Sequence, residues 1–393
     1  MTKHRRAIGR RAFLSSLAVA ASSCALANRP KQFNDKNDKV QAISDENRDF
    51  TLVGDAPLRD RAAAKNLIYG AATGYQILSS DSAFAQSFAK ECAMLVPENA
   101  LKLGTLRPSA THFDFTEGDA LAEFARTHNM LFRGHTLVWG YDFDGSEWLR
   151  NTVNSQNAER VLIRHIKTVV GHYAGEIHSW DVVNEAIDPS HGRADGLAKT
   201  QWLKFLGPDY IDLAFRTAAE ADPKALLVYN GDLLDHDTPD ADARRAATLN
   251  LLKNLKSKGT PVQALGIQAH LWANKPINAS KLRAFLRDVA QLNLKILITE
   301  LDVIDQKLPP ESDRRDRSVA RVYEDYLSIV LDEPAVIAVV TWGLSDRFTW
   351  HSQFNPREDK APVRPLPLDA QGKRKLAWNA IARSFDRSPK RKV

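Results

Sequence analysis

The sequence is poor in cysteine and lacks any recognisable metal-binding pattern. Only two of its 393 residues are cysteines, Cys24 and Cys92, which are too few for a zinc site built from thiolates. The histidines form neither an H-x-H nor an H-E-x-x-H pattern. The stretch Gly70-Ala-Ala-Thr-Gly74 does not match the G-x-G-x-x-G pattern of a dinucleotide site. We therefore expect no metal and no cofactor.

Long apolar runs are also lacking. No run of 18 apolar residues occurs, so we expect no membrane span in the mature chain. Residues 1–11 carry five cations and no acid, and an apolar stretch of small residues then leads to Ala25-Leu-Ala27. This pattern predicts an export signal over residues 1–27. Because Arg10-Arg11 and the next three residues resemble the twin-arginine motif, we expect a periplasmic or secreted protein; a lipoprotein signal that uses Cys24 is the alternative.

The basic character of the chain belongs mainly to that signal. Removing its five cations lowers the formal net charge from +6 to +1, so we expect no nucleic-acid partner. Residues 28–55 are expected to form a flexible polar leader, and residues 389–393 a basic, solvated tail. Without Cys24 the mature chain has no disulfide, and Cys92 is expected to be a small core residue of a monomer.

Eight short apolar runs recur between residues 56 and 388, and most are separated by segments with helical spacing. The runs are 68–73, 93–99, 131–139, 179–185, 225–232, 264–271, 295–302 and 338–346. Such alternation predicts parallel strands joined by helices, and eight units predict a (β/α)8 TIM barrel as the single catalytic domain, 56–388. A doubly wound open sheet is the alternative, although it favours a glycine-rich nucleotide turn that the sequence lacks.

Two of these runs end in glutamates, Glu185 and Glu300. The carboxyl ends of barrel strands open into the active-site mouth, so two glutamates from distant runs are expected to form one site. Because side chains alternate along a strand, further polar groups are predicted to share faces with their neighbours. The predicted faces are Ile296, Ile298, Glu300 and Asp302; Gln268 and His270; and His135, Leu137 and Trp139.

Paired carboxylates of this kind suit glycoside hydrolysis. One carboxyl group donates a proton to the leaving oxygen, and the other attacks the anomeric carbon or activates water. The ionised partner needs hydrogen-bond donors, such as His270, to remain charged. Aromatic side chains at the same strand ends, including Trp139 and Trp342, fit the apolar faces of a sugar ring.

Six motifs in the same order resemble those of family 10 glycoside hydrolases, the endo-1,4-β-xylanases. They are Glu98-Asn-Ala-Leu-Lys102, Arg133-Gly-His-Thr-Leu-Val-Trp139, Trp180-Asp-Val-Val-Asn-Glu185, Gln268-Ala-His270, Ile298-Thr-Glu-Leu-Asp302 and Trp342-Gly-Leu-Ser-Asp346. The resemblance implies xylan or xylo-oligosaccharides as substrates, Glu185 as acid/base and Glu300 as nucleophile. It also implies double displacement with retention of configuration, and carboxyl groups about 5–5.5 Å apart.

The resemblance further implies roles for the surrounding residues. Asn184 would bind the sugar 2-hydroxyl, and His270 would hold Glu300 while Asp302 supports His270. Lys102 and His135 would bind hydroxyls on the glycone side, and Glu98, Asn99 and Gln268 would extend that network. Trp342 and Trp350 would form the wall of the glycone side, and Trp139 would form its floor.

The chain departs from the family pattern at two places. Leu103 follows Lys102 where the family usually has tryptophan, and the chain reads Asn230-Gly-Asp-Leu233 where the family shows Asn-Asp-Tyr-Asn. The second departure predicts weaker or different binding on the aglycone side. A retaining β-1,4-glucanase or mixed glycanase remains an alternative, as does a non-catalytic carbohydrate-binding barrel, although such a barrel would typically lack one of the two carboxylates.

Overall fold

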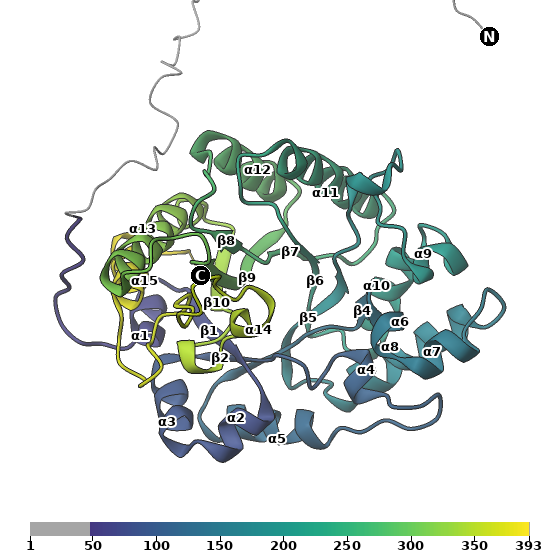
Figure 1. Cartoon of the computed structure of the whole chain (residues 1–393). Coiled ribbons are helices and arrows are strands. Elements are labelled where there is room, and N and C mark those ends of the chain that lie inside the picture. The colour runs from purple at the N-terminus through teal and green to yellow at the C-terminus, as the bar shows by residue number, and fades with distance from the viewer. Residues whose placement is uncertain (1–47, 393) are drawn as a thin grey trace, which may run out of the picture. The chain divides into compact units, whose positions relative to one another are not determined.

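Eight parallel strands pair side by side in a closed ring in the computed structural model, which describes residues 48–392 (Figure 1). The ring runs β1-β2-β3-β5-β6-β7-β9-β10 and closes because β10 pairs with both β9 and β1. The short strands β4 and β8 pair with β5 and β9 and extend the third and sixth positions of the ring. The predicted (β/α)8 barrel is therefore confirmed. The export signal, Cys24 and residues 28–47 of the expected leader lie outside the described residues.

The strands coincide closely with the predicted apolar runs. They are β1 Ile68–Thr73, β2 Met94–Pro97, β3 Leu131–Gly134, β4 Val138–Trp139, β5 Ile177–Asn184, β6 Leu226–Gly231, β7 Ala264–Ile267, β8 His270–Trp272, β9 Lys295–Ile304 and β10 Val336–Thr341.

Helices surround the ring of strands (Figure 1). The longer ones are α3 Ser82–Glu91, α5 Thr116–Thr127, α8 Ala158–His172, α10 Tyr210–Ala221, α11 Pro239–Ser257, α12 Ala279–Gln291, α13 Ser312–Val330 and α15 Leu376–Arg387. The shorter ones are α1 Leu58–Ala63, α2 Tyr75–Ser80, α4 Leu103–Leu106, α6 Asp142–Gly145, α7 Glu147–Thr152, α9 Gln201–Leu206, α14 His351–Phe354 and the 3-10 helices η1 Pro189–His191 and η2 Asp346–Phe348. Between residues 48 and 392, no helix combines the length and apolar character needed to cross a bilayer.

Local signals in the sequence explain where several helices begin. The Thr238 hydroxyl accepts a hydrogen bond from the Ala241 N–H at the start of α11, and Pro239 occupies the first turn, where its missing N–H costs nothing. Asn278 caps α12 in the same way by accepting from the Lys281 N–H. These caps fix the first turn of each helix.

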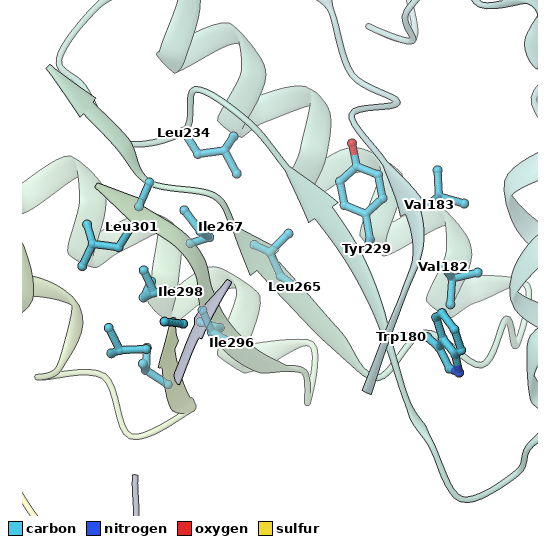
Figure 2. Close-up of a cluster of buried hydrophobic side chains, with 14 of the residues drawn as sticks. Trp180, Val182, Val183, Tyr229, Leu234, Leu265, Ile267, Ile296, Ile298 and Leu301 are labelled. Atoms are coloured by element: carbon cyan, nitrogen blue, oxygen red, sulfur yellow. The ribbon is translucent and has the colours of Figure 1, made fainter. Parts of the chain in front are cut away.

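The barrel has two apolar layers. An outer cluster fills the space between strands and helices, and Figure 2 shows part of it, including Trp180, Tyr229 and Ile298. Two smaller clusters form the inner layer: one contains Val228, Ala264, Leu297 and Ala338, and the other contains Ala72, Met94, Val96, Val340 and Trp342. Cys92 is buried in the outer cluster, as predicted.

Strand β9 does not keep the strict alternation that the sequence predicts. Between Val339 and Thr341 of β10 the register shifts, because β9 contains one residue more over the same interval. An extra residue of this kind is a β-bulge, and it turns the following side chains to the opposite face. Ile296 and Ile298 consequently pack in the outer cluster, whereas Glu300 hydrogen-bonds inside the barrel mouth. The predicted common face of Ile296, Ile298, Glu300 and Asp302 is wrong.

The third apolar run is likewise interrupted. It divides into β3 and β4, and the residues between them leave the regular ladder. Leu137 packs in the outer cluster, while His135 and Trp139 make contacts in the barrel mouth. The prediction that these three side chains share one face is therefore wrong for Leu137.

Both ends of the described chain pack more firmly than the sequence suggests. Phe50 is buried in the outer cluster, and Arg48 pairs with Asp325 at 2.6 Å. Near the other end, the Arg391 guanidinium is buried and donates to the carbonyls of Val336 and Leu331. The expectations of a flexible leader reaching residue 55 and of a solvated tail are thus wrong for Phe50 and Arg391.

Candidate active site

Glu185 stands directly after β5 in an unusual backbone conformation. Its φ is +55°, in the left-handed region that side chains with a Cβ rarely adopt. Its N–H donates to the Asn230 carbonyl of the neighbouring strand at 2.9 Å, which fixes the turn. A non-glycine residue held in this region by its surroundings is often a functional one.

The Glu185 carboxylate accepts hydrogen bonds from three side chains. Trp139 Nε1 lies 2.9 Å from one oxygen, and Gln268 Nε2 and Asn184 Nδ2 lie 2.8 and 3.1 Å from the other. Trp139, Asn184 and Gln268 belong to the third, fourth and sixth of the predicted apolar runs, respectively. The side chain is half-buried, so the carboxylate is oriented but remains accessible from the mouth of the barrel.

Glu300 is buried and accepts from a different set of donors. Asn230 Nδ2 lies 2.7 Å from one carboxylate oxygen, and His270 Nε2 lies 3.2 Å from the other. Burial alone would raise the pKa of Glu300. The hydrogen bond from His270 and the nearby charges of His135 and Lys102 outweigh it, so the pKa of Glu300 is lowered from its ordinary value. Glu300 is therefore held in its ionised form.

Asn230 links the two glutamates. The same Nδ2 that donates to Glu300 lies 2.8 Å from the Asn184 amide oxygen, and Asn184 in turn donates to Glu185. The Thr299 hydroxyl donates to the Asn230 oxygen at 2.7 Å and fixes the orientation of the amide. No role was predicted for Asn230. Its place at the end of the fifth apolar run was a usable signal.

His270 bridges Glu300 and Asp302 in the predicted manner. Its Nδ1 lies 3.0 Å from an Asp302 oxygen. Burial opposes the charge on the imidazole, but Asp302 and then Glu300 raise the pKa of His270 well above its usual value. Trp350 Nε1 and His351 Nε2 lie 3.0 and 2.8 Å from the other Asp302 oxygen. His351 was not predicted, because it begins the short helix α14 in a segment without a recognisable motif.

This cluster is also the place where a metal would be sought. Ligand atoms of His270, Asp302 and His351 lie within 4.8 Å of one another. However, a His270 protonated on both nitrogens has no lone pair to offer a metal. The arrangement therefore fits a chain of charged hydrogen bonds that orients Glu300.

Lys102 and His135 form the other side of the site. Asp181 accepts from His135 Nδ1 at 2.9 Å and also pairs with Arg133, so the imidazole is firmly held. The Lys102 ammonium lies 5.2 Å from the Trp139 ring centre and 6.0 Å from that of Trp342, which is within cation–π range.

Two further predicted binding residues accompany Lys102. Asn99 is exposed, and its amide oxygen accepts from Lys102 Nζ at 3.0 Å. Burial raises the pKa of Glu98, against the opposing charges of Lys102 and His135. Gln268 is predicted to extend the same network as Glu98 and Asn99. In the structure it contacts Glu185 and Asn184.

The two glutamates thus have different surroundings. Glu300 is buried and kept ionised by cationic donors, whereas Glu185 is more accessible and is oriented by an indole and two amides. Glycoside bond cleavage uses two carboxyl groups whose surroundings differ in this way. Indole rings and hydrogen-bonding side chains around them match the faces and edges of a sugar.

Comparison with known proteins agrees with this geometry. The profile of glycosyl hydrolase family 10 matches residues 57–384. The chain belongs to this family. It is therefore a glycoside hydrolase, and its substrate is a carbohydrate.

Individual relatives are similar over most of the chain. Endo-1,4-beta-xylanase B of Thermotoga neapolitana is 34% identical over 312 residues, which are 79% of this chain and 87% of that protein. Exoglucanase XynX of Acetivibrio thermocellus is 32% identical over 356 residues, which are 87% of this chain but 31% of that longer protein. The structure of xylanase 10B from Thermotoga petrophila RKU-1 in complex with xylobiose has a TM-score of 0.76 at 32% identity, covering 86% of this chain and 99% of that one.

Gly266 of β7 leaves room for the Asn230 link. A Cβ at this position would lie 2.2 Å from the Asn230 amide oxygen. We expect Gly266→Ala to displace Asn230 and to lower kcat/KM on xylo-oligosaccharides about a hundredfold, since misplacing catalytic groups by about 1 Å costs that much. Gly171→Ala in α8 is the matched control, because a Cβ there meets nothing within 4 Å. Equal activity of the two variants would contradict the role given to Asn230.

Proposed function

We propose that this protein hydrolyses internal β-1,4-xylosidic bonds of xylan by double displacement, with retention of anomeric configuration. The observation that carries the proposal is a pair of glutamates in different surroundings: Glu300 is held in its ionised form, and Glu185 is accessible. The xylanases among the relatives support the substrate class. In a retaining enzyme the two carboxyl groups lie about 5–5.5 Å apart, and we expect that separation here.

In the first step Glu300 attacks the anomeric carbon while Glu185 gives its proton to the leaving oxygen. The bond to the leaving sugar breaks, and a glycosyl–Glu300 ester forms. In the second step Glu185 takes a proton from water, whose oxygen attacks the same carbon and releases Glu300. His270 and Asn230 hold Glu300 in position throughout, and Asn184 binds the 2-hydroxyl of the sugar that reacts.

The remaining contacts serve the sugars on the glycone side. Lys102 and His135 bind hydroxyls of the sugar next to the cleaved bond, and Trp342 and Trp350 wall that part of the site. Glu98 and Asn99 orient Lys102, while Gln268 and Trp139 orient Glu185. Asp302 supports His270.

A β-1,4-glucan substrate is the second candidate, because one relative is named an exoglucanase. The two substrates differ by the C5 hydroxymethyl group of glucose. We expect kcat/KM to be higher on an aryl xylobioside than on the matching aryl cellobioside. The first product of xylo-oligosaccharide hydrolysis, followed by NMR, should be the β-anomer. A higher rate on the cellobioside would favour the glucanase, and an α-anomer as first product would exclude double displacement.

The pH dependence follows from the pKa of Glu300. Since this pKa is lowered from the ordinary value of a glutamate and the nucleophile must be ionised, the acid limb of kcat/KM is expected at a lower pH than a free glutamate carboxyl would give. His270→Asn removes a cationic donor, so the pKa of Glu300 rises and the acid limb moves to higher pH. His128→Asn, an exposed histidine in the turn after α5, is the control. An acid limb that stays in place or moves to lower pH in His270→Asn would contradict this electrostatic role.

We also propose that residues 1–27 direct export through the twin-arginine route, on the basis of Arg10-Arg11 and Ala25-Leu-Ala27. The N-terminus of the exported protein tests this. A chain that begins at Asn28 supports the proposal, while a lipid-modified chain that begins at Cys24 supports the lipoprotein alternative.

A further inference from the structure

A cavity of about 460 Å³ opens beside Glu185. Tyr141, Asp188, Asp232 and Arg244 are among its lining residues, whereas Glu300 and the two tryptophans assigned to the glycone side are not. Because the proton donor faces the leaving oxygen, a cavity that contains Glu185 but not the nucleophile receives the part of the substrate that leaves.

Asp232 emerges next to Glu185 from the neighbouring strand. Asn184 and Asn230 are register partners in β5 and β6, and Glu185 and Asp232 follow them by one and two residues. The side chain of Asp232 is 22% exposed and lines the cavity. Two carboxyl groups, one from each strand, thus border the space for the leaving sugar.

Arg244 of α11 holds Asp232 in this place. Its Nη1 lies 3.2 Å from both oxygens of Asp232 and 2.8 Å from the Ile187 carbonyl. Asp188 and Asp240 pair with the same guanidinium at 3.2 and 3.0 Å. The guanidinium is buried and saturated, so it fixes Asp232 and is not itself free to bind substrate.

Most of the residues that line the cavity carry polar side chains. Among the described residues that line it, Tyr141 is the one exposed aromatic side chain, and Phe143 is buried. Burial and the charge of Glu185 raise the pKa of Asp232 to about 7 despite Arg244. A carboxyl group of this kind accepts hydrogen bonds from hydroxyls when ionised and also donates one when protonated.

We propose that Asp232, held by Arg244, hydrogen-bonds a hydroxyl of the first sugar on the leaving side of the cleaved bond. Recognition of that sugar then depends on a carboxylate more than on a stacked aromatic ring. The inference rests on the proposed function, because it assigns this cavity to the leaving part of a polysaccharide. Asp232 is then expected to favour cleavage when the leaving group is a sugar over cleavage when it is an aryl group.

The test compares xylotetraose, whose cleavage places a sugar in the cavity, with 4-nitrophenyl xylobioside, whose productive cleavage places an aryl group there. For Asp232→Ala, the ratio of kcat/KM on xylotetraose to that on the aryl substrate is expected to fall about tenfold or more. Asp240→Asn is the matched control, because it removes the charge of another Arg244 partner but lies outside the cavity lining. Its ratio should stay within about twofold of the parent ratio.

Three outcomes separate the possibilities. An unchanged ratio in Asp232→Ala overturns the inference, even if both rates fall together. An equal fall in Asp240→Asn also overturns it, because the effect then arises from Arg244 and the surrounding fold. Absence of turnover on both substrates in the parent protein refutes the proposed function itself. Asp232→Asn, which keeps the shape and can still hydrogen-bond, should recover part of the ratio and shows that a fall in Asp232→Ala is not a folding defect.

Discussion

Glu300→Ala is expected to lower kcat on xylo-oligosaccharides and on aryl xylobiosides by about 100,000-fold, the scale seen when a covalent nucleophile is removed. The side chain is buried, and its carboxylate is oriented by Asn230 and His270. No glycosyl ester forms without it. Unlike loss of an acid catalyst, this loss should not depend on the quality of the leaving group, because the attacking atom itself is gone. Initial rates on aryl xylobiosides with good and poor leaving groups provide the measurement.

Glu159→Ala is a suitable control, because Glu159 is exposed on α8, and it should retain parent activity. The nucleophile can also be identified directly in the parent protein. A 2-fluoro xylobioside with a good leaving group slows the second step more than the first, so the ester accumulates and peptide mass analysis locates it. The label is expected on Glu300. A label on another residue, or continued turnover by Glu300→Ala, would refute the assignment.

The placement of the two glutamates could be predicted from the sequence because it depends on local features. Apolar runs mark the strands, and the carboxyl ends of parallel barrel strands necessarily meet at one end of the ring. Glu185 and Glu300 each end or nearly end such a run, so their proximity followed from topology alone. The His270 bridge was also predicted, through the family resemblance, and its contacts are present.

Features that depend on contacts between distant segments were not predicted. The bulge in β9 arises from its register against β10 and leaves no mark in the apolar pattern. Asn230 becomes important only because Gly266 lets its amide reach between two other strands. His351 reaches Asp302 from the start of the short helix α14, which follows the last strand. The burial of Arg391 likewise depends on carbonyl groups more than 50 residues away.

Glu185→Ala is expected to produce a different defect from Glu300→Ala. The first step then lacks a proton donor, so kcat/KM should fall steeply on xylo-oligosaccharides but little on substrates such as dinitrophenyl xylobioside, whose leaving group needs no proton. The second step lacks a base, so the glycosyl ester should accumulate, giving a burst of aryl product followed by slow turnover. Stopped-flow absorbance and mass analysis of the intact protein measure the burst and the trapped ester.

Azide distinguishes the two glutamates by stereochemistry. In Glu185→Ala the ester on Glu300 blocks one face of the sugar. Azide needs no deprotonation, so it can attack from the opposite face, where the Glu185 carboxylate has been removed. The product is a β-glycosyl azide. In Glu300→Ala azide occupies the place of the missing nucleophile and attacks the substrate directly, which yields the α-glycosyl azide. NMR of the products separates these cases. Rescue and the β-product both require an ester on Glu300 that azide attacks from the opposite face. If Glu185→Ala is not rescued by azide, or yields the α-product, the acid/base role of Glu185 is therefore wrong.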